Sequence, residues 1–330
     1  MAPDNCYIAG DIGGTKTNLG CFLPGRARPR LLYSASFPSP QFADLETILA
    51  KFMTGAPEHP VVSACFGIAG PVVGGCSRTT NLPWLVSEKA IQRRFGWPKV
   101  RLVNDLVATA MAVTVLNSRE VVSVNPNRIK KSGNLALVAP GTGLGLALLV
   151  AHNGQHIPVA SEGGHAGFSP GDDEEADLWQ YLHGEFGHVS AERVLSGQGL
   201  VNIFQWLKDS GRFREPRWLA NARTEGDPAK AVSDAALIRK TPIAVAALHR
   251  FVSILGAVSG DFALTGMAFG GVYLGGGIPP RIQSAIMSGP FQEAFTRKGR
   301  FKSMLEKTAV RIILNDRAAL LGAAIGAIGA

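Results

Sequence analysis

The dipeptide Asn104-Asp105 follows residues 100–103, a short run that we expect to form a strand. In open α/β sheets, ligands bind in the crevice beyond the carboxyl ends of the strands. A carboxylate at that place, Asp105, has the position of a general base. Asp is also a common cap of the helix that follows a strand. These two residues alone leave both interpretations open.

A second pair of reactive side chains stands in the tetrapeptide Glu162-Gly163-Gly164-His165. A carboxylate accepts hydrogen bonds, and an imidazole donates or accepts them, so together they can contact neighbouring hydroxyls of a sugar. A purely structural loop is the alternative. A metal site is disfavoured because no third ligand stands at a known spacing. Glu192 is a further candidate, although a solvated helical residue would look the same.

The opening stretch, residues 7–23, has apolar residues on both sides of Gly10-Asp11-Ile12-Gly13-Gly14-Thr15, which predicts two strands joined by a glycine-rich turn. Gly13 and Gly14 can adopt backbone angles closed to other residues, and such turns can point several N–H groups at an anion. Asp11 is an unusual neighbour for a phosphate unless a divalent cation or its waters lie between them. An ordinary β-hairpin is the alternative.

Two more turns combine glycine with an apolar run, Gly141-Thr142-Gly143 and Gly275-Gly276-Gly277. The first is flanked by apolar residues as the opening turn is, which suggests two related α/β halves. The second would let a flat ligand such as a purine approach the backbone closely. Each of these signals is weak by itself.

The elements that must position these residues alternate between short apolar runs and segments of helical periodicity, which predicts a mixed α/β sheet. We expect a helix between a Ser190 cap and Gly197, another that begins in the acidic residues 172–175, and a polar surface excursion at residues 208–230. Strands are expected at residues 31–37, 61–68, 100–103, 135–139, 146–151, 272–274 and 310–314, and further helices at 42–52, 88–95, 106–116, 242–260 and 318–328.

The composition is typical of a folded globular protein. The chain has 330 residues, 46% of them hydrophobic and 18% charged, enough for two domains with sizeable cores. Its net charge is +8, but the basic residues are scattered and accompany no nucleic-acid-reading motif, so we expect no nucleic-acid partner.

The four cysteines, Cys6, Cys21, Cys65 and Cys76, match no zinc spacing, and the first three lie in or beside apolar runs typical of a reducing cytosol. The N-terminus lacks the pattern of a signal peptide. Residues 134–151 carry no charge but are interrupted by Pro140 and glycines, which favours two strands over a membrane span. We therefore expect a cytoplasmic protein without membrane contact.

In their order along the chain, these motifs resemble those of the bacterial glucokinase family, within the hexokinase and actin-like ATPase superfamily. The resemblance runs nearly end to end, and the block from Ser190 to Gly197 is specific to that family. The chain has no cysteine beyond Cys76, which favours glucokinases over the related repressor and kinase proteins that carry a zinc motif after the Glu-x-x-His element. The matching segments are residues 10–15, 80–84, 104–105, 141–143, 162–165, 188–197 and 270–277.

The resemblance implies an α/β protein with the actin-like ATPase (ribonuclease H-like) fold, in which two α/β domains flank a cleft. The small domain would hold residues 1–112 and the C-terminal helix 316–330, and the large one residues 113–315. It also implies a homodimer, and ATP with Mg²⁺ as cofactors.

The same resemblance implies roles for individual residues in the phosphorylation of glucose at its 6-hydroxyl. Asp105 would be the catalytic base. Residues 10–15 would form the ATP phosphate loop, the 141–143 turn would face the phosphates, and the 275–277 turn the adenosine. The residues implied to bind glucose are Asn81, Asn104, Asp105, Glu162, His165 and Glu192.

Two other functions remain open on the sequence. One is a kinase for a different hexose or an amino sugar. The other is a sugar sensor or DNA-binding regulator without catalytic activity, which the sequence pI of about 9.5 would suit but for which no nucleic-acid-reading element is seen.

Overall fold

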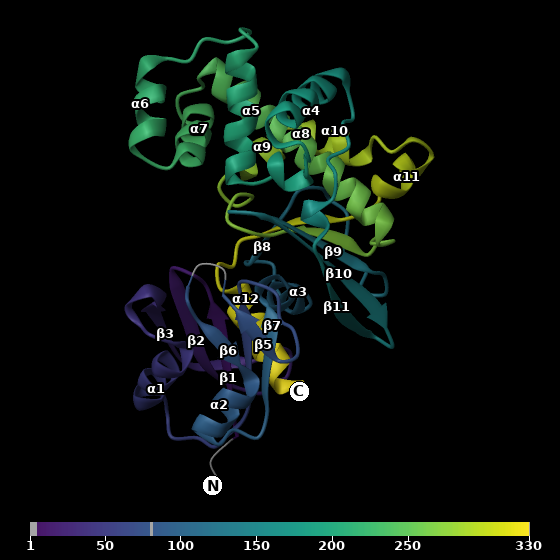
Figure 1. Cartoon of the computed structure of the whole chain (residues 1–330). Coiled ribbons are helices and arrows are strands. Elements are labelled where there is room, and N and C mark those ends of the chain that lie inside the picture. The colour runs from purple at the N-terminus through teal and green to yellow at the C-terminus, as the bar shows by residue number, and fades with distance from the viewer. Residues whose placement is uncertain (1–4, 80–81, 330) are drawn as a thin grey trace. The chain divides into compact units, whose positions relative to one another are not determined.

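The computed structural model describes residues 5–79 and 82–329. The chain divides into two compact units (Figure 1). The first comprises Met1–Glu120, His156–Ala160 and Asn315–Ala330, and the second Val121–Gln155 and Ser161–Leu314. The resemblance implies domain boundaries after residue 112 and before residue 316. These boundaries stay a prediction.

The first unit is built on a five-stranded sheet with the order β3-β2-β1-β4-β7. The pairs β1–β2 and β2–β3 are antiparallel, whereas β4 runs parallel to β1 and β7 parallel to β4. A small hairpin of β5 (Cys76–Arg78) and β6 (Leu85–Ser87) follows β4 in the chain. The five strands are β1 (Cys6–Ile12), β2 (Lys16–Leu23), β3 (Arg30–Pro38), β4 (Val61–Ile68) and β7 (Val100–Asn104).

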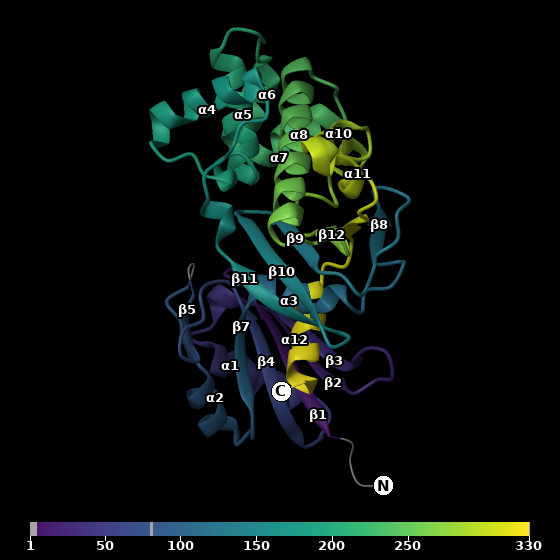
Figure 2. The same ribbon diagram turned by 90° about the vertical axis from the view of Figure 1, so that its right-hand side faces the viewer.

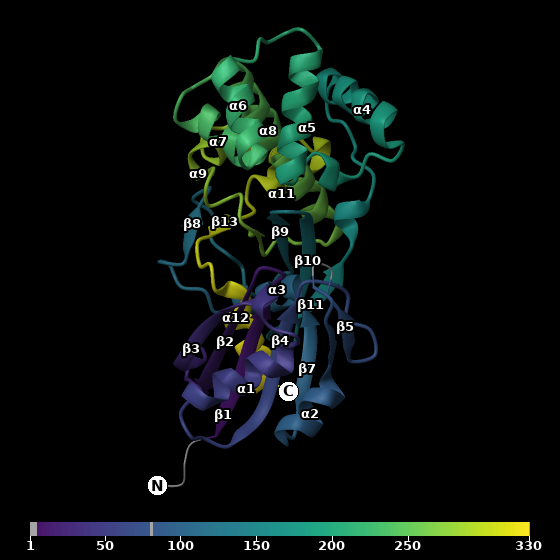
Figure 3. The same ribbon diagram turned by 60° about the vertical axis from the view of Figure 1, so that its left-hand side comes forward.

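Alternation along β1 sends successive side chains to opposite faces of this sheet. Ile8 and Ile12 join a core with helix α1 (Leu45–Gly55), whereas Ala9 joins one with α3 (Asp105–Val113) and α12 (Ala318–Ile328). Figure 2 shows α12 across one face, and Figure 3 brings α1 in front of the other. A Cβ on Gly322 of α12 would overlap the Ala108 carbonyl, so glycine permits the close packing of α12 on α3.

The second unit repeats this plan in a six-stranded sheet with the order β11-β10-β9-β12-β13-β8. Strands β9 and β10 are antiparallel, and β12 runs parallel to both β9 and β13, as β4 does to β1 and β7. The suspected internal repeat is therefore confirmed, and the uncharged residues 134–151 are two strands joined by a turn. The strands are β8 (Val121–Ser123), β9 (Leu135–Pro140), β10 (Leu144–His152), β11 (Gln155–Ser161), β12 (Gly271–Leu274) and β13 (Val310–Ile313).

Helices make up most of the rest of the second unit and share one large core with its sheet (Figure 1). The longest helix, α8, is apolar and long enough to cross a bilayer, but 67% of its most apolar window is buried inside the protein, as in the core helix of a soluble protein. The helices are α4 (Asp173–Phe186), α5 (Gly197–Asp209), α6 (Arg217–Glu225), α7 (Pro228–Leu237), α8 (Pro242–Thr265), α9 (Gln283–Ile286), α10 (Pro290–Thr296) and α11 (Lys302–Leu305).

Two expectations about local structure are wrong. The segment after Ser190 is a single 3₁₀ turn, η3 (Ala191–Arg193), and the helix begins where we expected one to end. Ser196 caps α5 by accepting from the Gly199 N–H at 3.0 Å, so Gly197 is the first residue of a helix. The excursion at residues 208–230 contains α6, because Leu219 is fully buried and anchors that helix to the core.

Candidate active site

The predicted site residues fall in both units, and each half is described by itself. In the first unit, Asn104 ends β7 and Asp105 begins α3. Asn104 is the helix cap, since its Oδ1 accepts from the Leu106 N–H at 2.9 Å. Its Nδ2 also donates to the carbonyl of Gly70 at 3.2 Å. The capping role considered for Asp105 therefore belongs to its neighbour.

Asp105 is held by the same donor, because its Oδ1 accepts from the Leu106 N–H at 2.8 Å. Burial raises the pKa of Asp105 to about 6; the Leu106 N–H opposes that rise, and the nearby Asp11 carboxylate adds to it. A Cβ on Gly67 of β4 would come within 2.9 Å of the Ala108 Cβ and 3.5 Å of the Asp105 Cα. Glycine at position 67 therefore lets the start of α3 settle against the sheet.

Asp11 lies on β1, one residue before the strand ends. Burial raises its pKa, and the hydrogen bond from Asn18 Nδ2, at 3.2 Å, lowers it in part. Ser36 Oγ donates to Asn18 Oδ1 at 2.5 Å and so orients the amide. The two carboxylates of this half-site, Asp11 and Asp105, thus both favour the neutral form more than a solvated Asp does.

The turn between β1 and β2 is tight. The Gly13 N–H donates to the carbonyl of Lys16 at 3.0 Å, which leaves the N–H groups of Gly14 and Thr15 as its candidate anion donors. Gly13 and Gly14 have no positive φ, so the expected use of left-handed backbone angles is wrong. The segment is therefore a β-hairpin, and this geometry is compatible with anion binding.

Gly10 and Ile12, also expected in the phosphate loop, are strand residues of β1. A Cβ on Gly10 would lie 2.5 Å from Phe66 Cδ1 and 2.9 Å from Leu19 Cδ2. The ring of Phe66 occupies the space that a side chain at position 10 would need, so packing explains this glycine. Asn81, expected to bind the sugar, lies outside the described residues.

In the second unit, Glu162 precedes a 3₁₀ turn, η2 (Gly163–His165). A Cβ on Gly164 would overlap the carbonyl of Leu144, so glycine lets this turn lie against the start of β10. Glu192 lies on η3, and its Oε1 is 4.0 Å from His165 Nδ1. The structure therefore brings Glu192 and His165, 27 positions apart in sequence, to one place, with Glu162 on the same loop as His165.

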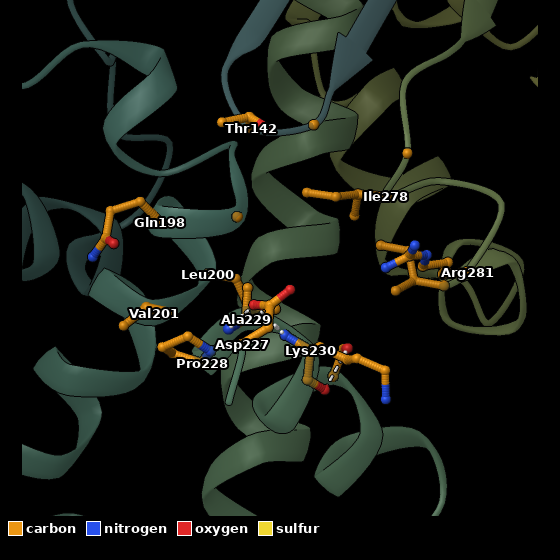
Figure 4. A pocket seen from close by; sticks show the side chains of 15 residues that line it. Thr142, Gln198, Leu200, Val201, Asp227, Pro228, Ala229, Lys230, Ile278 and Arg281 are labelled. Carbon is orange, nitrogen blue, oxygen red and sulfur yellow. Dashed lines mark hydrogen bonds between the residues drawn. The ribbon is translucent and has the colours of Figure 1, made fainter. Parts of the chain in front are cut away.

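A cavity of about 490 Å³ lies wholly within the second unit. Gly141, Thr142 and Gly277 line it, so it brings together two of the predicted glycine turns (Figure 4). The Gly275 N–H donates to the carbonyl of Val138 at 2.9 Å, which fixes the second turn beside the end of β9. A Cβ on Gly276, whose φ is +77°, would overlap the carbonyl of Pro140.

Sequence reasoning missed other lining residues of this cavity, namely Gln198 of α5, Asp227 and Lys230 at the start of α7, and Arg281, which follows the 275–277 turn (Figure 4). Asp227 caps α7, its Oδ1 accepting from the N–H groups of Ala229 and Lys230 at 3.0 and 3.1 Å. The Asp227-Pro228 pair was the available signal, since Asp favours the cap position and Pro the first helical position.

The glucokinase family model matches residues 8–329 of the chain. The chain belongs to the glucokinase family. A glucokinase of Nostoc sp. is 34% identical, and the match covers 96% of this chain and 97% of that protein. Glucokinases phosphorylate glucose, so this chain is a sugar kinase by family.

Solved structures agree with this family assignment. A glucokinase from an Antarctic psychrotroph has a TM-score of 0.89 at 29% identity, covering 98% of this chain and 99% of that one. A ROK-family glucokinase from Streptomyces griseus, solved with glucose and AMPPNP, has a TM-score of 0.65 at 21% identity, with 98% and 100% coverage. The expected actin-like ATPase fold is confirmed for this glucokinase-family chain by these neighbours and by the repeated sheet order.

Proposed function

We propose that the chain transfers the γ-phosphoryl group of ATP to the 6-hydroxyl of glucose, with Asp105 as general base. Asp105 accepts the hydroxyl proton as the oxygen bonds to the γ-phosphorus and the bond to the β-phosphate oxygen breaks, which yields glucose 6-phosphate and ADP. The observation that carries this proposal is the half-buried Asp105 carboxylate just after β7, oriented by the Leu106 N–H, with a pKa of about 6. A base with a pKa near the working pH is suited to proton transfer.

Glucose is proposed to be recognised by side chains from both halves of the site. Asn104 and Asp105 belong to the first unit, and Glu162, His165 and Glu192 to the second; Asn81 keeps the sugar-binding role implied by the resemblance. The approach of Glu192 to His165 supports this assignment, because a carboxylate beside an imidazole can engage adjacent hydroxyls. A site built on so many polar groups rejects sugars that lack a matching hydroxyl.

ATP is proposed to bind in the cavity of the second unit, with the adenosine at the 275–277 turn and the phosphates towards the 141–143 turn. The lining of that cavity by Gly141, Thr142 and Gly277 supports this assignment. Arg281 adds positive charge, whereas the ammonium of Lys230 is paired with Asp234 at 2.6 Å. The S. griseus relative was solved with glucose and AMPPNP, which supports a sugar and a nucleotide as the ligands of this chain. Gly14 and Thr15 are the proposed donors to the transferring phosphoryl oxygens.

Asp11 is the residue proposed to reach Mg²⁺, directly or through water, while ATP supplies most of the ligands. This fits a cation that keeps several waters and is bound by one or two carboxylates plus substrate phosphates. No group of three or more His, Cys, Asp or Glu side chains that could hold a metal ion exists among residues 5–79 and 82–329. Bound Mg²⁺ would neutralise charge on the phosphates.

We further propose that the enzyme works in the cytoplasm as a homodimer and has neither nucleic acid nor membrane as a partner. The two domains, residues 1–112 with 316–330 and residues 113–315, are proposed to close around the substrates and exclude water. The scattered basic residues support an enzyme of small molecules over a DNA-binding regulator.

A sugar panel tests the proposal. Purified protein is assayed with ATP, Mg²⁺ and glucose, mannose, fructose or N-acetylmannosamine, with ADP formation as the readout. We expect the highest kcat/KM for glucose. A higher value for mannose or N-acetylmannosamine would assign the chain to another sugar, and absence of turnover with every sugar would contradict kinase activity altogether.

A further inference from the structure

The two carboxylate oxygens of Glu192 have different surroundings. Oε2 accepts from the backbone N–H of Leu144 at 2.8 Å, immediately after the 141–143 turn. Oε1 lies 4.0 Å from His165 Nδ1, on the side assigned above to the sugar. One carboxylate thus contacts both the backbone of the proposed phosphate turn and the proposed sugar-reading histidine.

The backbone around Glu192 is fastened to the same turn. The Gly197 N–H donates to the carbonyl of Gly141, and the Gly141 N–H donates to that of Gly143, each at 2.8 Å. Ser196, which caps α5, donates through Oγ to the Glu192 carbonyl at 2.9 Å. The segment from Glu192 to Gly197 and the 141–143 turn are therefore one hydrogen-bonded assembly, so displacement of one part strains the other.

Little space is left between the Glu192 carboxylate and the 141–143 turn. A Cβ on Gly143 would stand 2.5 Å from Glu192 Oε2 and 3.4 Å from its Cδ. Neither Gly143 nor Gly141 has a positive φ, so alanine suits the backbone at both positions. At Gly141 the nearest atom to an added Cβ is the Gly277 nitrogen at 3.8 Å, an ordinary contact. The two glycines of one turn thus differ in whether a methyl group would displace Glu192.

We propose that Glu192 is a positioning residue that couples sugar binding to the geometry of the 141–143 turn, an inference that rests on the proposed function. A sugar hydroxyl bound between Oε1 and His165 fixes the carboxylate, and Oε2 then fixes the Leu144 N–H and with it the peptide that follows Gly143. The coupling is reciprocal, because a nucleotide that orders the turn must improve sugar binding by the same factor.

The test compares glucose binding to Gly143→Ala and Gly141→Ala by titration calorimetry, with and without AMPPNP and Mg²⁺. For the wild type we expect nucleotide to tighten glucose binding about fivefold or more, the lower end of usual coupling. Gly143→Ala should weaken glucose binding about tenfold without nucleotide and bring the coupling factor to about one. Gly141→Ala should leave the nucleotide-free glucose Kd within about twofold of the wild type, because the added methyl makes only an ordinary contact with the Gly277 nitrogen.

Exchange of the Leu144 amide hydrogen supplies a readout that a purely structural role would not give. Glucose should slow this exchange in the wild type and in Glu192→Gln, whose amide oxygen can still accept from Leu144. It should leave the fast exchange of Glu192→Ala unchanged. The inference is overturned if Gly143→Ala and Gly141→Ala bind glucose alike, or if glucose leaves Leu144 exchange unaltered. Failure of the wild type to bind or phosphorylate glucose would instead reject the proposed function.

Discussion

Asn104 and Asp105 accept hydrogen bonds from one and the same backbone N–H, that of Leu106, at 2.9 and 2.8 Å. The amide of Asn104 caps α3, so the carboxylate that follows it is not required to begin the helix. Asp105 is instead half-buried with a pKa raised by desolvation, an arrangement that costs stability. Groups held in such an unfavourable state cluster at functional sites.

The pH dependence of catalysis follows from the pKa of Asp105. A general base acts only when ionised, so kcat/KM for glucose at saturating ATP and Mg²⁺ should fall as pH drops through about 6 and level off above it. Asp11→Asn removes a like charge, so in the protein without nucleotide or Mg²⁺ the Asp105 carboxyl, followed by NMR, should titrate at lower pH than in the wild type. Equal titration of Asp105 in wild type and variant would show that the Asp11 charge does not act on the base.

Asp105→Asn should stabilise the protein at neutral pH. A carboxyl whose folded-state pKa is raised above its unfolded value favours folding below both values, and that contribution is lost as pH rises from about 4 to about 6. The variant should therefore melt a few degrees above the wild type at pH 7 and close to it at pH 4. An unchanged or lowered Tm at pH 7 would contradict the cost assigned to Asp105.

Asp44 offers the matched control for that experiment in the same unit. It caps α1 by accepting from the Thr47 N–H at 2.7 Å. Bonding to the Thr47 side chain is the main cause that lowers its pKa, and burial opposes it. Asp44→Ala should cost about 1 kcal/mol at pH 7, as loss of a cap usually does, and less as pH falls through its lowered pKa. Its kcat should match the wild type.

Ser39 is predicted to hold the turn between β1 and β2 in place. Its Oγ donates to the Gly13 carbonyl at 2.8 Å and meets the Thr17 hydroxyl at 2.9 Å, and both side chains are fully buried. Ser39→Ala removes a buried donor, so we expect a loss of about 1–3 kcal/mol in stability. The KM for ATP should rise about threefold or more, while that for glucose stays within about twofold of the wild type.

Ser63 is the control for Ser39, because its hydroxyl is buried in the same unit without a hydrogen-bond partner among the described residues. Ser63→Ala should be neutral or stabilising and leave both KM values unchanged. Calorimetric melting and steady-state kinetics of the two variants check this pair. Equal effects of the two substitutions on the KM for ATP would contradict the role of Ser39 in holding the turn between β1 and β2.

Sequence reasoning located the central strands of both sheets, because buried strands are short apolar runs bounded by glycine or proline. It missed β5, β6, β8 and β11, which lie at sheet edges or in a small hairpin and have few buried residues. The same reasoning predicted a helix between Ser190 and Gly197, whereas the helix α5 begins at Gly197. Serine before a helix and glycine after one are common, so the pattern fitted the segment before Gly197 as well as the one that begins there. Here Ser196 is the cap, and the preceding turn is fixed by long-range bonds, such as that from the Ala191 N–H to the Ala166 carbonyl, which no local pattern encodes.

The candidate site was predictable to the level of residue type but not of role. The pattern left Asp105 open as a base or a helix cap, and only the resemblance implied the base. The structure gives the capping role to Asn104, which depends on which side chain reaches the Leu106 N–H. Gly10 belonged to the expected phosphate loop, whereas the ring that demands a glycine there, Phe66, lies 56 positions away in sequence. The cavity wall formed by α5 and α7 was missed because it depends on how helices pack.

The most direct test of the central claim is the kcat of Asp105→Asn measured beside its glucose Kd. We predict that kcat with glucose, ATP and Mg²⁺ falls about 10²–10⁴-fold, the usual contribution of a general base. The glucose Kd should change by no more than about tenfold, because the amide still offers the sugar an oxygen. A variant that keeps kcat within a few-fold of the wild type while folding normally would contradict the assignment of Asp105 as the base.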